Sequence, residues 1–177
     1  TGPITDYAAD IRLATSGVDR LTGRVTLAGD AAAGRSFTAW LGGDPTPLFL
    51  PDYAAFFGPD VRLDLAGAHA PDGRLDLERM LVETQALRLQ GRQALAADGL
   101  PELIALQGTV AAADGGPVLL PVATPTRVGR VGLRVDYDAA AGESWSARAE
   151  VSDLDRPDFD AASVTLDGSG RITRGGG

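Results

Sequence analysis

The chain has 177 residues, a mass of 18.2 kDa and a net charge of −8, from 16 basic and 24 acidic residues. This acidic balance disfavours a nucleic-acid partner, because phosphate backbones are held by clustered positive charge. Cysteine and lysine are both absent. Their absence excludes disulfides, thiolate metal sites, Schiff-base chemistry and a phosphate-binding P-loop lysine.

Apolar and polar residues alternate along most of the chain, and this period-two pattern is typical of half-buried β-strands. Tight turns such as Pro71-Asp72-Gly73 separate the alternating stretches. The pattern predicts roughly ten strands, over residues 7–13, 21–27, 37–41, 61–67, 75–77, 87–91, 104–110, 131–137, 145–151 and 162–166.

Residues 48–57 break the alternation and predict a short helix. Pro51 suits the first position of a helix, and Gly58-Pro59 would end it. The apolar residues Tyr53, Phe56 and Phe57 would then share one side of that helix. We expect a second short helix at 78–86, where residues typical of strands are few.

Strands that follow one another without intervening helices favour an antiparallel meander over a βαβ sheet. The expected fold class is all-β, with residues 1–177 as one segment: a curved antiparallel sheet that forms an open apolar groove and carries one or two short helices. Such a sheet must cover its apolar face with a second sheet, by closing on itself, or by curling around a ligand. A closed sandwich therefore stays open as the alternative.

The sequence offers no clear catalytic or metal-binding constellation, so we expect neither an enzyme nor a cofactor. His69 is the single histidine, and zinc or general-base chemistry needs further partners. The acidic residues Asp153, Asp155, Asp158 and Asp160 lack the order of a calcium loop, so a solvated turn is the preferred interpretation. No Gly-x-Ser-x-Gly elbow occurs.

Four stretches, taken in order, resemble a known family over most of the chain. They are Leu50-Pro51 with Phe56-Phe57-Gly58-Pro59 and the strand 61–67; Gly73-Arg74-Leu75-Asp76-Leu77 leading to 87–91; Leu106-Gln107-Gly108-Thr109-Val110; and the strand 133–138 with Trp145 seven residues on. This combination resembles the C-terminal region of the translocation and assembly module B (TamB) proteins, within the wider AsmA-like family.

The resemblance implies a long β-groove of the β-taco kind, in proteins anchored in the inner membrane of diderm bacteria and crossing the periplasm. It implies a role in moving phospholipid toward the outer membrane, and in assembling outer-membrane proteins with a barrel partner. Because the sequence starts at Thr1 and ends at Gly175-Gly176-Gly177 after an apparent strand, we expect an excised segment. The inner-membrane anchor and the partner-binding end would then lie in missing regions.

The expected ligand is the acyl part of phospholipids, held on a smooth wall of aliphatic residues without a headgroup site. Roughly ten strands spaced about 4.8 Å apart would give a trough on the order of 45 to 50 Å long. Adjacent segments of the same chain would pair at the two sheet edges. The residues expected to line the groove are Val25, Leu27, Val61, Leu63, Leu65, Leu75, Leu77, Leu87, Leu89, Leu106, Val131, Leu133, Val135, Val164 and Leu166.

Two other functions stay open at this stage. One is a non-enzymatic structural or adhesive domain of a surface protein, built as a sandwich or a solenoid, although no strict repeat period is found. The other is a carbohydrate-binding module, which needs exposed coplanar aromatic rings. Trp40 and Trp145 are the two tryptophans available for it.

Overall fold

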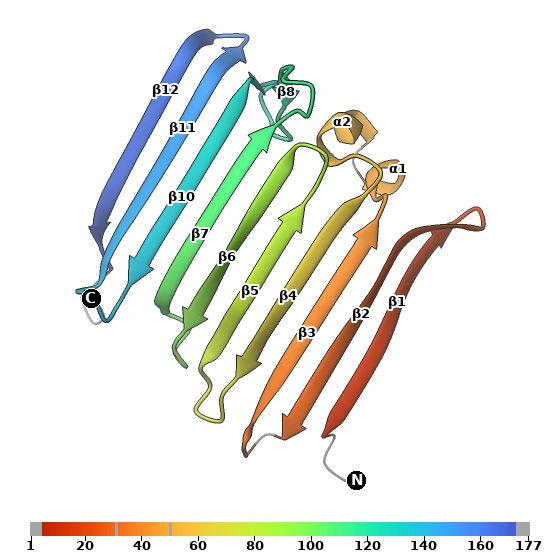
Figure 1. Cartoon of the computed structure of the whole chain (residues 1–177), viewed down its shortest axis with the longest axis vertical. Coiled ribbons are helices and arrows are strands. Elements are labelled where there is room, and N and C mark those ends of the chain that lie inside the picture. The colour runs from red at the N-terminus through yellow and green to blue at the C-terminus, as the bar shows by residue number, and fades with distance from the viewer. Residues whose placement is uncertain (1–4, 31, 50, 173–177) are drawn as a thin grey trace.

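A computed structural model describes residues 5–30, 32–49 and 51–172 of the chain (Figure 1). Thr1, Leu50 and Gly175–Gly177, which entered the sequence predictions, lie outside these described residues. The strands are β1 (Asp6–Thr15), β2 (Val18–Asp30), β3 (Gly34–Gly43), β4 (Val61–His69), β5 (Leu75–Glu83), β6 (Leu87–Leu95), β7 (Pro101–Ala111), β8 (Val118–Leu119), β9 (Arg127–Val128), β10 (Arg130–Asp138), β11 (Ser144–Arg156) and β12 (Phe159–Arg171). The helical pieces are α1 (Thr46–Phe49), η1 (Pro51–Tyr53) and α2 (Ala54–Phe57).

All the strands belong to one open antiparallel sheet. The ten long strands lie side by side in chain order, β1 to β7 and then β10 to β12, while the two-residue strands β8 and β9 join at one end of β11 (Figure 1). The prediction of an all-β, curved and open antiparallel sheet is therefore confirmed. Within the described ranges no second sheet packs against this one, so these residues form an open sheet.

A single layer leaves much of the chain in contact with solvent. The molecule exposes 10837 Å² of surface, whereas a compact monomer of this mass exposes about 8,100 Å². The excess arises because a sheet without a facing layer buries its side chains only against their neighbours in the sheet. The usual central hydrophobic core is accordingly replaced by a small cluster at one rim.

The small buried cluster forms where the helical pieces and the β8–β9 hairpin fold over the end of the sheet. Phe56, Ala86, Val118 and Val128 are its buried members, and Phe56 is only 5% exposed. The rings of Phe56 and Phe57 meet edge to face with centroids 5.0 Å apart. The partly buried residues packed against the cluster include Tyr53, Leu87, Val110, Val131 and Val151. The helical segment thus covers one end of the sheet.

The helical segment lies where the sequence predicted a helix, but it consists of the short pieces α1, η1 and α2 in place of one continuous helix. Pro51 begins η1, and α2 ends at Phe57, where Gly58 takes a φ of 68° that suits glycine. Hydrogen bonds from the β5–β6 turn hold the backbone of this segment, and the Thr84 hydroxyl donates one of them to the Phe56 carbonyl at 2.9 Å. The amides of Gln85 and Ala86 donate to the carbonyls of Phe57 and Phe56, both at 3.0 Å.

The helix predicted at 78–86 is wrong, because residues 75–83 form strand β5. The reason is a β-bulge. Leu77 pairs with Gly67 of β4 and Arg79 pairs with Ala66, so Glu78 is an extra residue without a partner in the ladder. Leu77 and Met80 then share one face although they are three residues apart, which destroys the period-two pattern.

Candidate functional site

Strand register places all fifteen predicted groove residues on the same face of the sheet, because residues directly opposite each other in a ladder share a face. One cross-strand row shows the principle: Leu89 faces Gly108, Gly108 faces Leu133, and Leu133 faces Ala149. The remaining predicted groove residues lie on the same face as this row, because the cross-strand pairings from β2 to β12 connect them to it. We call this surface the apolar face. It carries the fifteen residues Val25, Leu27, Val61, Leu63, Leu65, Leu75, Leu77, Leu87, Leu89, Leu106, Val131, Leu133, Val135, Val164 and Leu166.

The apolar face continues beyond the residues predicted for it. Tyr7, Ile11 and Leu13 extend it onto β1, and Ile104 and Tyr137 extend it on β7 and β10. None of the fifteen residues is buried, and Leu133 and Leu166 are 39% and 61% exposed. The rim cluster around Phe56 covers the row that contains Leu87, Val110, Val131 and Val151. The rest of the face stays open in the described part of the molecule.

Glycines keep the apolar face flat, because bulky side chains from neighbouring strands lie over them. A Cβ atom built on Gly67 would lie 2.8 Å from the Phe37 ring, and one on Gly91 would lie 2.6 Å from Leu106 Cδ2. Trp145 covers Gly170 in the same manner. Large side chains therefore lie down on the sheet instead of projecting from it. Gly67 and Gly91 are the last residues of the predicted strands 61–67 and 87–91, but they lie inside β4 and β6, and the side chains that cover them are known only once the register is known.

Replacing Gly91 with alanine is expected to lower the free energy of unfolding by about 2 kcal/mol, the usual range for overpacking. The new Cβ would collide with the Ala105 carbonyl oxygen as well as with Leu106 Cδ2. Urea unfolding followed by circular dichroism measures the change.

Gly132 is the matched control for this substitution. It also lies inside a strand, but a Cβ atom there meets nothing within 4 Å. Gly132→Ala should therefore be neutral, or stabilise by up to about 1 kcal/mol through a less flexible unfolded chain. Equal stability of the two variants would show that Gly91 is not held by close packing.

The opposite surface, here called the polar face, carries ladders of arginines and carboxylates. Arg134 lies beside Asp136 at 2.6 Å, and Arg79 donates to Asp64 at 2.9 Å. These pairs are exposed, so each contributes little to stability. Arg148 shows the electrostatic pattern: its hydrogen bond to Glu150, together with the nearby Asp167 carboxylate, raises its pKa above the ordinary value.

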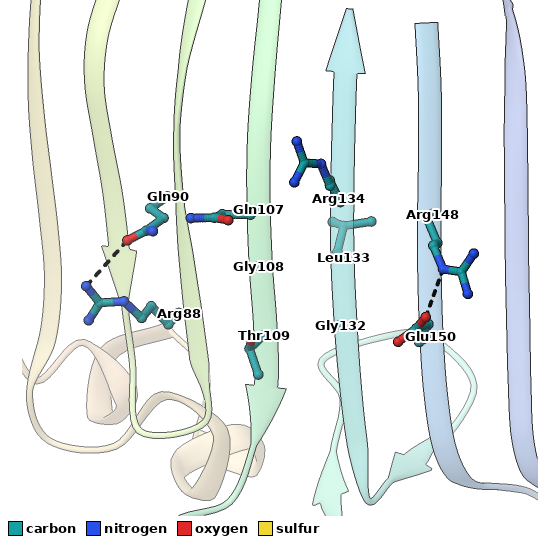
Figure 2. A pocket seen from close by; sticks show the side chains of 10 residues that line it. All are labelled: Arg88, Gln90, Gln107, Gly108, Thr109, Gly132, Leu133, Arg134, Arg148 and Glu150. Carbon is teal, nitrogen blue, oxygen red and sulfur yellow. Dashed lines mark hydrogen bonds and ion pairs between the residues drawn. The ribbon is translucent and has the colours of Figure 1, made fainter.

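The polar face also forms a shallow hollow of about 450 Å³ in the middle of the sheet (Figure 2). Arg88, Arg134 and Arg148 project around it, and Gly132 lies in its floor. Each of the three arginines already has a carboxylate partner: Glu83, Asp136 and Glu150 respectively. Figure 2 also shows Arg88 reaching Gln90 of the same strand, 3.4 Å away. With its cations neutralised in this way, the hollow offers little attraction to an anion.

The acidic residues near 153–160 are dispersed by the β11–β12 hairpin. Asp155 lies 4.0 Å from Arg127, and Asp158 accepts a hydrogen bond of 3.1 Å from Arg156. That hydrogen bond lowers the pKa of Asp158 below its ordinary value. In the parts of the chain that the structure describes, no three acidic or histidine side chains are arranged to hold a metal ion.

The two tryptophans lie on different faces of the sheet. Trp40 faces Arg24 and Asp64 on the polar face, whereas Trp145 faces Tyr137 and Gly170 on the apolar face. Together they do not build the coplanar platform that a carbohydrate-binding module needs. His69, the single histidine, ends β4 and is exposed.

No protein-family model, no curated protein and no solved structure matches the chain. Among the helical pieces that the structure describes, none has the length and hydropathy of a membrane-crossing helix.

Proposed function

We propose that this chain is a segment of a lipid conduit, in which the apolar face carries phospholipid acyl chains. The observation that supports the proposal most directly is an aliphatic surface that spans ten strands and that no other described part of the chain covers over most of its area. Water-exposed apolar surface of this extent is unfavourable, at about 25 cal/mol per Å². Acyl chains would remove it from water without requiring any specific polar contact.

The flatness of the apolar face suits movement along it better than capture. A ligand that is to slide must meet similar contacts at every position, since a deep pocket would hold it in one place. Phe37 over Gly67 and Leu106 over Gly91 fill depressions that would otherwise interrupt the surface. The described strands therefore present a wall with little relief.

The resemblance to the TamB and AsmA-like proteins adds a setting to the proposal. The segment would stand in the periplasm of a diderm bacterium, tied to the inner membrane by an anchor outside this sequence. It would serve outer-membrane biogenesis by conducting phospholipid, and an outer-membrane barrel partner would bind regions outside it. No part in catalysis is proposed for its residues.

Native mass spectrometry combined with lipid extraction tests the proposal on the purified chain. We expect phospholipid to co-purify and to appear as additional mass on the folded protein. A lipid-free monomer, recovered from cells that contain ample phospholipid, would overturn the conduit.

A structural role is the second candidate, and the sheet edges favour it. Both edge strands are long, and they expose large apolar side chains: Tyr7 of β1 and Phe159 of β12 are 53% and 51% exposed. Open edges of this kind pair readily with further strands. Lipid-free assemblies that grow with protein concentration would favour the structural role over the conduit.

A further inference from the structure

Two buried polar atoms on the apolar face have no hydrogen-bond partner in the described residues: Nε of Arg35 and the hydroxyl of Tyr137. Buried polar atoms are normally paired, so an orphan calls for an explanation. Arg35 is the more unusual of the two because it is a cation, and its side chain has no ion pair with any described residue. Arg92, Arg130 and Arg171 likewise have no ion pair with a described residue, but the register places them on the polar face.

Arg35 stands in a defined setting at one rim of the apolar face. On β4 its direct cross-strand partner is His69, and on β2 it is Gly29. Gly29 has no side chain to place beside Arg35, so His69 is the only one of its two direct cross-strand partners that presents a side chain to it. This rim is opposite to the rim covered by the helical pieces, as the course of β3 from Gly34 toward α1 shows (Figure 1).

We propose that Arg35 and His69 bind the phosphate of a phospholipid headgroup at this rim, with the acyl chains extending over the apolar face. A guanidinium and an imidazole on adjacent strands supply the donors that a phosphate oxygen needs. Unlike the ion-paired arginines of the polar face, such as Arg134 and Arg148, Arg35 has no carboxylate partner among the described residues that a phosphate would have to displace. The proposal rests on the proposed function and adds a polar end to a ligand surface that sequence reasoning expected to be entirely apolar.

The dimensions of the sheet fit an amphiphile oriented in this way. From His69 to Val61, β4 covers eight residue steps, or about 27 Å at about 3.4 Å per residue. Leu65 and Leu63 lie between them on the same face. A headgroup at His69 would therefore leave room for an extended chain before the opposite rim.

Titration of the purified chain with three probes tests the inference: lyso-phosphatidylglycerol, the neutral detergent dodecyl maltoside, and glycerol 3-phosphate. Because His69 is the only histidine, its imidazole resonances report on the site without assignment of other signals. We expect lyso-phosphatidylglycerol to shift these resonances. Arg35→Gln should weaken the affinity for this lipid about tenfold, since a charge-assisted hydrogen bond is lost, and should leave the affinity for dodecyl maltoside unchanged.

Arg92→Gln is the matched control, because it removes the same charge from the polar face and should leave both affinities unchanged. If Arg35→Gln does not fold, His69→Gln, at an exposed position, replaces it with isothermal titration as the readout.

Equal lyso-phosphatidylglycerol affinity in wild type and Arg35→Gln would overturn the headgroup site while leaving the conduit intact. Failure of both amphiphiles to bind would overturn the conduit as well. Glycerol 3-phosphate binding as tightly as the lipid would retain the phosphate site and exclude the lipid as its source.

Discussion

Leu133→Arg is expected to reduce the phospholipid that co-purifies with the chain at least tenfold, while the strand content measured by circular dichroism stays the same. Leu133 occupies the middle of the apolar face, between Gly108 and Ala149 in its cross-strand row. An arginine there would place an unpaired guanidinium against acyl chains, and such a charge is costly to remove from water. At 39% exposure the side chain adds little to folding, so the loss should concern the ligand alone.

Ser146→Arg provides the control, since it adds the same side chain to the polar face, where Ser146 is exposed opposite Asp136. This variant should keep its full lipid content. Val135→Asp, one row away from Leu133 on the apolar face, should repeat the loss with a charge of the opposite sign. Normal lipid content in both apolar-face variants, provided that they fold, would contradict the assignment of this face to acyl chains.

Phe56→Ala is expected to lower the free energy of unfolding by about 3 kcal/mol or more, the usual effect of truncating a buried phenylalanine. Phe56 is the largest side chain in the rim cluster, and the sheet has no central core that could compensate for it. A cavity would open beside Ala86, Val118 and Val128. Urea unfolding measured beside the wild-type protein gives the difference.

Val122→Ala serves as the comparison for Phe56→Ala. Val122 lies in the same excursion of the chain, between β8 and β9, but it is 45% exposed, so its truncation should cost less than about 0.5 kcal/mol. A Phe56→Ala variant as stable as Val122→Ala would show that the rim cluster contributes little to the free energy of unfolding. A large loss would identify the cluster as the principal hydrophobic anchor of a molecule that is otherwise one layer thick.

Most of the fold could be predicted from the sequence because the alternation of apolar and polar residues shows which residues form a strand and which face of the sheet each one occupies. Val131, Leu133 and Val135 alternate with Arg130, Arg134 and Asp136, and β10 follows that pattern without interruption. The same reasoning failed at β5, because the extra residue Glu78 interrupts the alternation there and few residues typical of strands remained to indicate a strand. Strands β8 and β9 were missed because two residues are too few to show a period.

The candidate headgroup site could not be predicted for a different reason. The predicted strand 61–67 stopped short of His69, whereas β4 continues to His69 and the register places His69 on the apolar face. Arg35 precedes Phe37 by two positions, which places it on that face. The proposed phosphate site, however, also needs His69, which lies directly opposite Arg35 on the neighbouring strand. Which residues face each other on neighbouring strands depends on the register of the two strands, and the sequence of one strand alone does not determine that register.

The number of long strands has a consequence for how a protein of this kind can change its length. With ten strands, the chain starts β1 and finishes β12 at the same rim of the sheet (Figure 1). Duplication or loss of one hairpin would widen or narrow the sheet by about 10 Å and return the chain to that rim, with every later strand keeping its direction. Insertion of a single strand would reverse all of them. The hairpin is therefore the natural unit in which evolution, or a protein engineer, could adjust the span of such a sheet.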